Sequence, residues 1–83
     1  MKLKFKLFAS LTDYLPADRK GNIVDLDLPA GTTIQTVIDQ YRVPEKSAHL
    51  VLVNGRFIPP SERATYVLEE CDELAIWPPV AGG

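Results

Sequence analysis

The last six residues of the sequence combine two prolines with two glycines, an arrangement suited to presenting a chain end to another protein. Proline fixes φ and favours an extended backbone, so this tail can hold a terminal carboxylate up to ~20 Å beyond the preceding element. Glycine has no Cβ, so such a chain end can thread a channel that any side chain would block. We therefore expect the carboxylate of Gly83 to be the chemical site and the preceding residues to deliver it to a partner: Trp77, Pro78, Pro79, Val80, Ala81 and Gly82. A frayed chain end is the simpler alternative, but it does not account for the stiff proline pair.

Outside the tail, the residue types that usually do chemistry are sparse. His49 is the only histidine and Cys71 the only cysteine, so the sequence predicts neither a metal site nor a disulfide, and it lacks the cysteine ligands of an iron–sulfur ferredoxin. We expect a structural role for His49 and an inert turn thiol at Cys71. An acidic group near the end is interpreted as a solvated turn, with steering onto a basic partner surface as the alternative: Glu69, Glu70, Asp72 and Glu73.

Length and composition describe a single small globular domain. The 83 residues are 46% hydrophobic and 24% charged, with a formal net charge of −2, and no basic stripe of the kind that binds nucleic acid is present. No apolar run reaches the ~20 residues of a membrane span, and the lysines that alternate after Met1 are unlike a signal peptide. The single cysteine indicates a reducing compartment. We therefore expect a cytoplasmic protein that binds other proteins, not membranes or nucleic acid, and holds no metal or cofactor of its own.

The hydrophobic pattern predicts strands near both ends of the chain. Residues 2–7 alternate lysine with apolar side chains, and residues 24–28 alternate apolar side chains with aspartate, which is the period of half-buried strands. If these strands pair as an antiparallel hairpin, the lysine row faces the aspartate row. A polar turn over 69–72 precedes a last strand over 73–77, which Pro78 ends because proline has no N–H for sheet pairing.

The middle of the chain predicts one main helix. Thr32 and Gln35 fit a capping box, and apolar residues follow at helical spacing from position 34 to position 41. Pro44 ends this helix because it steers the preceding residue away from helical angles. A shorter helical turn is predicted at 10–13, opened by a Ser10 cap.

The remaining segments complete the fold prediction. Residues 50–53 are apolar throughout, as in a strand covered on both faces; a turn at 54–55 leads to a short strand over 56–58, and 59–61 is predicted to be a loop. A single helix can cover only one face of the sheet, so the sequence predicts an α+β fold with the helix packed across one face of a mixed sheet. This element order is that of the ubiquitin-like β-grasp fold, in which the first and last strands are parallel neighbours. We expect a β-grasp domain over residues 1–77 and a flexible, extended functional tail over 78–83.

The segment from Cys71 to Gly83 resembles the end of the small subunit of molybdopterin synthase. In that family an acidic turn and an apolar strand are followed by an aromatic residue, Pro-Pro-Val, a small residue and Gly-Gly. Residues 52–55 resemble the family's Val-Asn-Gly turn, and residues 8–11 resemble the end of its first strand. The resemblance spans the chain in order and length, and Cys71 departs from it because the family usually has glycine in that turn.

The resemblance implies a sulfur carrier whose Gly83 carboxylate is converted to a thiocarboxylate. An adenylating enzyme of the ubiquitin-activating type would use ATP to form the Gly83 acyl-adenylate, and sulfur from a persulfide donor would displace AMP. The thiocarboxylate would then enter the large subunit of molybdopterin synthase, within a heterotetramer, and give its sulfur to the pterin precursor in molybdenum cofactor biosynthesis. On this interpretation the chain is not an enzyme on its own, because the catalytic groups belong to the large subunit.

Other functions stay open at this point. A related carrier could serve thiamine, tungsten cofactor or tRNA thiolation, and a ubiquitin-like modifier could be joined to lysines through Gly83. A β-grasp interaction module without tail chemistry is a further alternative. The proline pair before the glycines favours molybdopterin synthase over thiamine carriers, whose tails usually lack it. It does not separate a sulfur carrier from a modifier, because both begin with the same adenylation.

Overall fold

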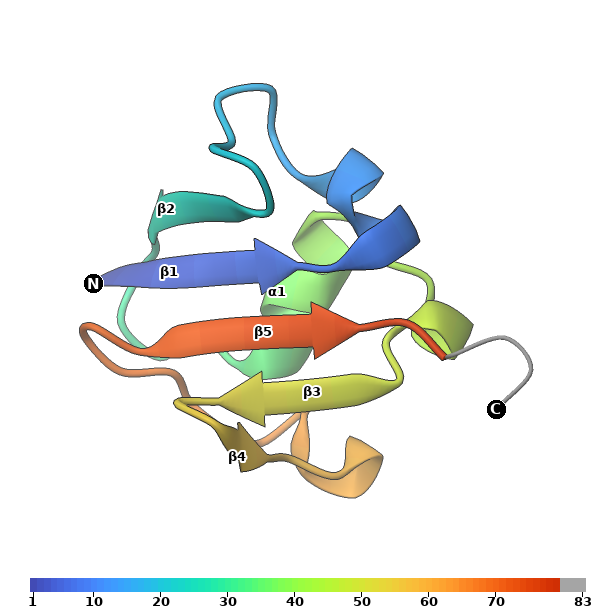
Figure 1. The fold of residues 1–83 in the computed structure, drawn as a ribbon. Coiled ribbons are helices and arrows are strands. Elements are labelled where there is room, and N and C mark those ends of the chain that lie inside the picture. The colour runs from blue at the N-terminus through green and yellow to red at the C-terminus, as the bar shows by residue number, and fades with distance from the viewer. Residues whose placement is uncertain (80–83) are drawn as a thin grey trace.

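The computed structural model describes residues 1–79 of the chain. Within this part, five strands form one mixed sheet in the order β2-β1-β5-β3-β4. The strands are β1 Lys2–Leu7, β2 Ile23–Asp27, β3 Leu50–Val53, β4 Arg56–Phe57 and β5 Glu73–Trp77. The main helix, α1 Ile34–Gln40, crosses the sheet behind β1 and β5 in Figure 1. Short 3-10 helices connect these elements: η1 Ala9–Tyr14, η2 Glu45–Ser47 and η3 Pro60–Glu62. This is the predicted α+β architecture of the ubiquitin-like β-grasp fold.

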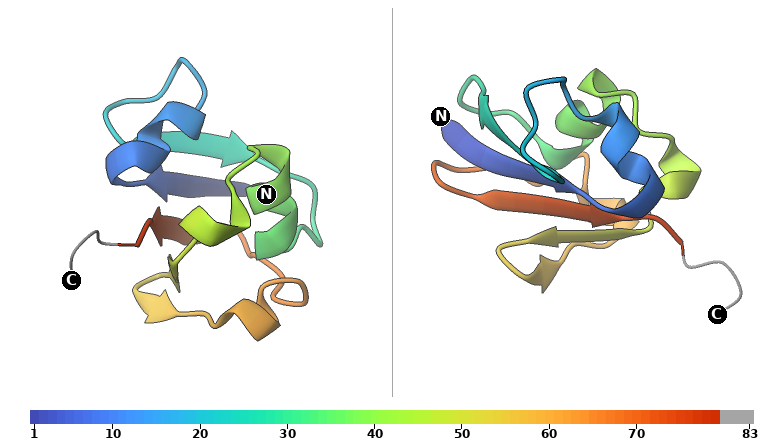
Figure 2. Two further views of the ribbon diagram at one scale, coloured as in Figure 1. Left: turned by 90° about the vertical axis from the view of Figure 1, so that its right-hand side faces the viewer. Right: turned by 45° about the horizontal axis from the view of Figure 1, so that its top comes forward.

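The core lies between α1 and one face of the sheet. Strands β1 and β5 are parallel, with Phe5 opposite Leu74, and their outer neighbours β2 and β3 run antiparallel to them. Both of these central side chains are 0% exposed, and each such burial contributes about 1.5–3 kcal/mol. The apolar stripe of α1 packs against them through Ile34, Val37 and Ile38. Helices α1 and η2 lie on the same side of the sheet in both views of Figure 2; we call the other side the outer face.

The first two strands pair in the predicted register. Lys2 lies opposite Asp27 and Lys4 opposite Asp25, and the Lys4 Nζ is 3.0 Å from the Asp25 Oδ1. Lys6 instead reaches across to β5, where its Nζ lies 2.7 Å from the Glu73 Oε1. The alternation of charged and apolar side chains therefore fixes both the register and the charged character of this part of the outer face.

The predicted cap of the main helix is wrong by one residue. Thr33, not Thr32, is the N-cap, and its Oγ1 accepts a hydrogen bond from the Thr36 N–H at 3.2 Å. Thr32 donates its hydroxyl to the Pro29 carbonyl at 2.7 Å. Gln35 does not return to the cap, because its amide donates to Asp39 Oδ1 at 2.9 Å. Two adjacent threonines offer the same capping chemistry, and the preceding turn decides between them.

Two shorter segments also differ from expectation. Ser10 does not cap the first helical turn, because it lies inside η1. The N-cap of η1 is Phe8, which makes no side-chain capping hydrogen bond. The chain turns sharply there, with Ala9 at φ +53°. The segment predicted as a loop at 59–61 contains η3, which starts at Pro60 because proline suits the first helical positions.

Candidate functional site: the end of β5 and the outer face

Strand β5 loses its sheet partners at Trp77. The last backbone hydrogen bond found there runs from the His49 N–H to the Trp77 carbonyl, at 3.2 Å. Pro78 is half-buried and Pro79 exposed, and neither has an N–H to continue the pairing. The predicted site residues Val80, Ala81, Gly82 and Gly83 lie outside the described residues. The structure therefore places the root of the tail, which we define as Trp77, Pro78 and Pro79.

An aromatic pair marks this root. The Trp77 indole stacks on the Phe8 ring, with centroids 4.0 Å apart and planes 4° from parallel. Trp77 is half-buried. Phe8 follows β1 directly, and its N–H donates to the Ile76 carbonyl at 3.1 Å. Because β1 and β5 are parallel neighbours, the ends of both strands bring these rings together at one edge of the outer face.

The stack continues into a row of apolar side chains on the outer face. Leu50 lies opposite Trp77, and Leu52 lies between Ala75 and Phe57. Leu50 is 37% and Phe57 49% exposed, an unusual position for large apolar side chains that form a contiguous group. We call this group the apolar strip: Phe8, Leu50, Leu52, Phe57, Ala75 and Trp77.

The strip was missed at the level of sequence because of one wrong prediction. The apolar run at 50–53 was expected to be covered on both faces, but only Val51 and Val53 point into the core, at 0% and 3% exposure. Leu50 and Leu52 point to the outer face. The sequence predicts only one main helix, and a single helix can bury only one face of a sheet. That prediction could have shown that two of the four apolar residues at 50–53 face away from the helix. Leucines on the other face are then available to a partner.

The opposite end of β5 is held by polar side chains. Asn54 donates its amide to Asp72 Oδ1 at 2.8 Å and accepts from the Glu73 N–H at 2.9 Å. Asp72 Oδ2 accepts from the Glu69 N–H at 2.8 Å. Asp72 is only 8% exposed, so the interpretation of this segment as a merely solvated turn is wrong for that residue. These bonds tie the turn before β5 to the turn after β3 and fix where β5 begins.

Cys71 lies in this turn, exposed and free. Its φ is +69°, in the left-handed region that favours glycine, and its N–H donates to the Lys2 carbonyl at 2.7 Å. This conformation explains in physical terms why glycine is usual at this position among the proteins that the sequence resembles.

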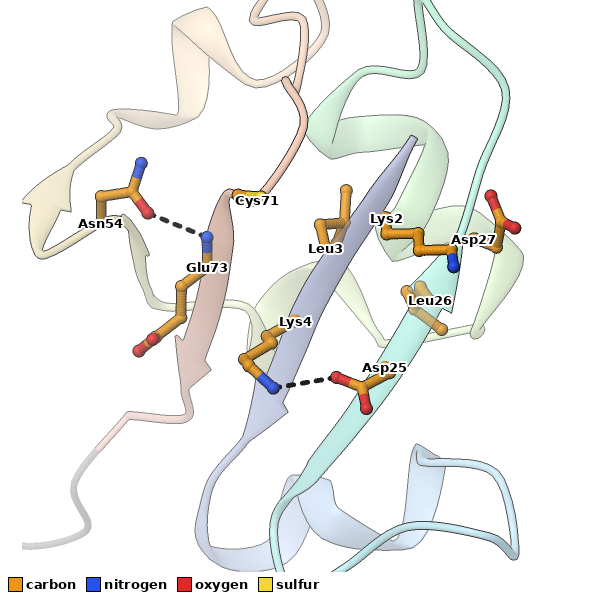
Figure 3. A pocket seen from close by; sticks show the side chains of 9 residues that line it. All are labelled: Lys2, Leu3, Lys4, Asp25, Leu26, Asp27, Asn54, Cys71 and Glu73. Atoms are coloured by element: carbon orange, nitrogen blue, oxygen red, sulfur yellow. Dashed lines mark hydrogen bonds and ion pairs between the residues drawn. The ribbon is translucent and has the colours of Figure 1, made fainter.

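A shallow hollow of about 590 Å³ lies beside Cys71, over the charged part of the outer face. Figure 3 shows its side chains, with the Lys4–Asp25 pair among them. We call this part the charged half: Lys2, Lys4, Lys6, Asp25, Asp27 and Glu73. Across residues 1–79, no group of three or more histidine, cysteine or acidic side chains could hold a metal ion. In the same part of the chain, no helix has the length and apolarity needed to cross a membrane.

A mixed five-stranded sheet with one main helix across one face places the chain in the class of ubiquitin-like β-grasp proteins. The sequence profile of the ThiS family matches residues 6–83. The chain therefore belongs to the ThiS family of ubiquitin-like sulfur carriers. Small carriers of this family work with partner enzymes. No curated protein sequence matches the chain.

Solved structures of similar proteins agree on the fold. SAMP1 from Haloferax volcanii matches with a TM-score of 0.69 and 23% identity, over 100% of each chain. A second crystal structure, of H. volcanii small archaeal modifier protein 1, matches at 0.67 and 24%, over 95% of this chain and 98% of that one. A putative molybdopterin converting factor, subunit 1, from Pyrococcus furiosus matches at 0.67 and 21%, over the same shares. At these identities the likeness is one of fold.

Proposed function

We propose that this chain is the sulfur-carrying subunit of a molybdopterin synthase, with the carboxylate of Gly83 as the group that is activated and sulfurated. One observation carries the proposal: β5 stops pairing at Trp77 and passes into two prolines at the end of the apolar strip. A partner that binds the strip is thereby placed next to the chain that follows Pro79. Membership of a sulfur-carrier family supports the same interpretation.

The proposed chemistry begins with activation of the carboxylate. An oxygen of the Gly83 carboxylate attacks the α-phosphorus of ATP, and pyrophosphate leaves. The terminal sulfur of a persulfide donor then attacks the acyl carbon, and AMP leaves. A thiol reduces the resulting acyl disulfide and releases the thiocarboxylate. The ATP-binding and acid–base groups belong to the partner enzymes in this proposal, and the carrier contributes a docking surface and a positioned chain end.

Delivery of the sulfur uses the same surface a second time. The large subunit of the synthase binds the apolar strip, with Trp77 and Phe8 as the aromatic anchors that interfaces favour. The glycine end enters the active site, where the thiocarboxylate gives its sulfur to the pterin precursor. A heterotetramer of two small and two large subunits fits this division of labour, in a reducing cytoplasm where thiols such as the one that releases the thiocarboxylate stay reduced.

A second candidate function shares the first chemical step. One of the structures that the chain matches, over 95% of its length, carries the name of a small archaeal modifier protein. In a modifier, a lysine amine attacks the activated Gly83 carbonyl instead of sulfur, and the product is an isopeptide. The two functions therefore diverge only after adenylation, and the product separates them.

The test is intact-mass analysis after incubation with the adenylating enzyme, ATP and a sulfur donor. The wild-type chain should gain the mass difference between sulfur and oxygen, and a thiol-specific tag with tandem sequencing should place it on Gly83. A chain lacking Gly83 should gain nothing, since a shift of one residue, ~3.5 Å, moves the reacting group out of reach. Lys4→Ala is the matched control and should react like the wild type.

Two results would contradict the proposal. Sulfur transfer by the chain that lacks Gly83 removes the tail from the mechanism. Lysine-linked conjugates in cell extract, with no thiocarboxylate formed, assign the chain to the modifier function instead.

A further inference from the structure

Arg63 is a buried cation that is held by backbone carbonyls. It is 5% exposed, and its guanidinium donates to the carbonyls of Ala48, His49 and Ile58 at 2.7, 3.2 and 3.4 Å. Burial lowers the pKa of Arg63, and the charge of Glu45 opposes that effect. None of the ion pairs found within residues 1–79 includes it. Burying an arginine without a carboxylate is costly, so its contacts call for an explanation.

One of these contacts leads directly to the root of the tail. The carbonyl of Ala48 and the N–H of His49 belong to the same peptide unit, which is planar and rigid. Arg63 Nη1 binds the carbonyl side at 2.7 Å, and the N–H side donates to the Trp77 carbonyl at 3.2 Å. The guanidinium therefore orients this peptide plane and, by polarising it, strengthens the bond on the other side.

This peptide plane adjoins η2, where the Ala48 N–H donates to the Pro44 and Glu45 carbonyls at 3.0 and 3.2 Å. Ala48 ends η2 with φ −83° and ψ +69°, outside the regular helical and extended regions. The backbone carbonyl of Arg63 also accepts the N–H of Gln35, in the first turn of α1, at 2.9 Å. Arg63 thus connects α1, the segment before β3 and the end of β5.

We propose that Arg63 is a positioning residue for the tail, which sets its exit direction through the Ala48–His49 peptide. This inference rests on the proposed function and names a residue that the sequence did not single out. The Trp77 carbonyl carries the last backbone bond before the prolines, so its orientation sets the direction in which Pro78 and Pro79 leave the sheet. A shift of about 1 Å in a reacting group can lower a rate about 100-fold.

The surroundings of Arg63 allow a clean test. A hollow of about 260 Å³ borders it, lined also by Gln35, Glu45 and Lys46. Water can enter there and bind the freed carbonyls when the side chain is replaced, so the fold should survive. None of the residues that line the hollow belongs to the apolar strip, so partner binding should not change.

The experiment compares Arg63→Met and Arg63→Lys with the wild type and with Val24→Ala. Val24 is buried in β2, across the sheet from Arg63, and its truncation controls for lost stability alone. Hydrogen exchange of the His49 amide, relative to amides of β1, reports the peptide contact. Pyrophosphate release with the adenylating enzyme gives kcat and KM.

In Arg63→Met we expect exchange at His49 to rise about tenfold or more, and kcat to fall by about ten- to 100-fold with KM changed less than about twofold. Arg63→Lys keeps the charge but not the forked guanidinium that donates several hydrogen bonds. Its exchange rate at His49 and its kcat should lie between those of Arg63→Met and the wild type. Val24→Ala should leave kcat and the relative exchange at His49 unchanged.

Unchanged exchange at His49 in Arg63→Met overturns the inference whatever the activity, and so does faster exchange with an unchanged kcat. A wild-type chain that no adenylating enzyme activates contradicts the proposed function instead, while exchange at His49 still decides whether Arg63 holds the tail root.

Discussion

The outer face of the sheet has two regions of opposite character on one continuous set of strands. In the charged half, lysines of β1 face aspartates of β2, and Lys6 reaches Glu73. In the apolar strip, leucines of β3 lie beside Ala75 and Trp77 without any helix over them in residues 1–79. Charged side chains that are already paired gain little from a partner, whereas exposed apolar side chains gain about 25 cal/mol for each Å² buried.

The difference follows from which residues occupy the outward positions. The backbone of β1 and β3 has the same pleat, and both strands bury their inward residues completely or nearly so. The outward aspartates of β2, an edge strand, also discourage pairing of that edge with other chains. One face can therefore hold a docking surface next to a region that discourages unspecific contact.

The largest effect is expected from a charge placed in the apolar strip. Leu50→Asp should weaken binding of the adenylating enzyme by about 100-fold, because a desolvated carboxylate would lie beside Trp77. Leu50 is 37% exposed in the free chain, so the fold should remain intact. Isothermal titration with both proteins gives the affinity, and thermal unfolding checks the fold.

The matched variant for this test lies in the charged half. Lys4→Ala should change the affinity by less than about twofold. If Lys4→Ala weakens binding as much as Leu50→Asp does, the division of the outer face into a docking and a non-docking region is wrong.

The next effect concerns stability at the start of β5. Asp72→Ala removes two hydrogen bonds and leaves the Asn54 amide and the Glu69 N–H without their acceptor. Leaving such groups unsatisfied typically costs about 1–3 kcal/mol, so the free energy of unfolding should fall by about 2–3 kcal/mol. Urea unfolding measures it. A loss below about 0.5 kcal/mol, typical of an exposed polar residue, would restore the solvated-turn interpretation.

Local sequence patterns correctly predicted the features that depend on alternation or on helical spacing, namely the register of the first two strands and the apolar stripe of α1. The lysine and aspartate rows of residues 2–7 and 24–28 gave the register of the first hairpin, because a period of two leaves only one way to bury the apolar side chains. The stripe of α1 was predicted correctly for the same reason. The apolar strip could have been inferred, but only by combining the run at 50–53 with the number of helices.

Non-local contacts could not be read from the sequence. Asp72 is buried because Asn54, 18 residues earlier, meets it where the end of β3 lies beside the start of β5. Arg63 is buried because Ala48, 15 residues earlier, presents its carbonyl there. A solvated carboxylate and a buried one can have the same neighbours in the sequence. Only the folded structure, in which distant strands become neighbours, shows which of the two Asp72 is.

A smaller, opposite effect is expected at Cys71. The left-handed conformation costs a residue with a Cβ about 1–2 kcal/mol, part of which glycine offsets through its greater freedom in the unfolded chain. Cys71→Gly should therefore raise the free energy of unfolding by about 0.5–1 kcal/mol and leave sulfur transfer unchanged. Chemical denaturation with the thiocarboxylate assay checks both. Loss of sulfur transfer in Cys71→Ser, with the fold preserved, would show instead that the thiol takes part.

The smallest effect should come from the ion pair in the middle of the charged half. Lys4 Nζ and Asp25 Oδ1 are 3.0 Å apart, but the two side chains are 57% and 82% exposed, so water and salt screen their attraction. A double-mutant cycle with Lys4→Ala and Asp25→Ala should give a coupling of about 0.2–0.5 kcal/mol that shrinks further in high salt. The double variant should bind the adenylating enzyme like the wild type. A coupling above about 1 kcal/mol would mean that this pair shapes the fold. A loss of binding in the double variant would mean that the docking surface extends across β1. The apolar strip and the charged half would then both contribute to binding and would differ only in how much.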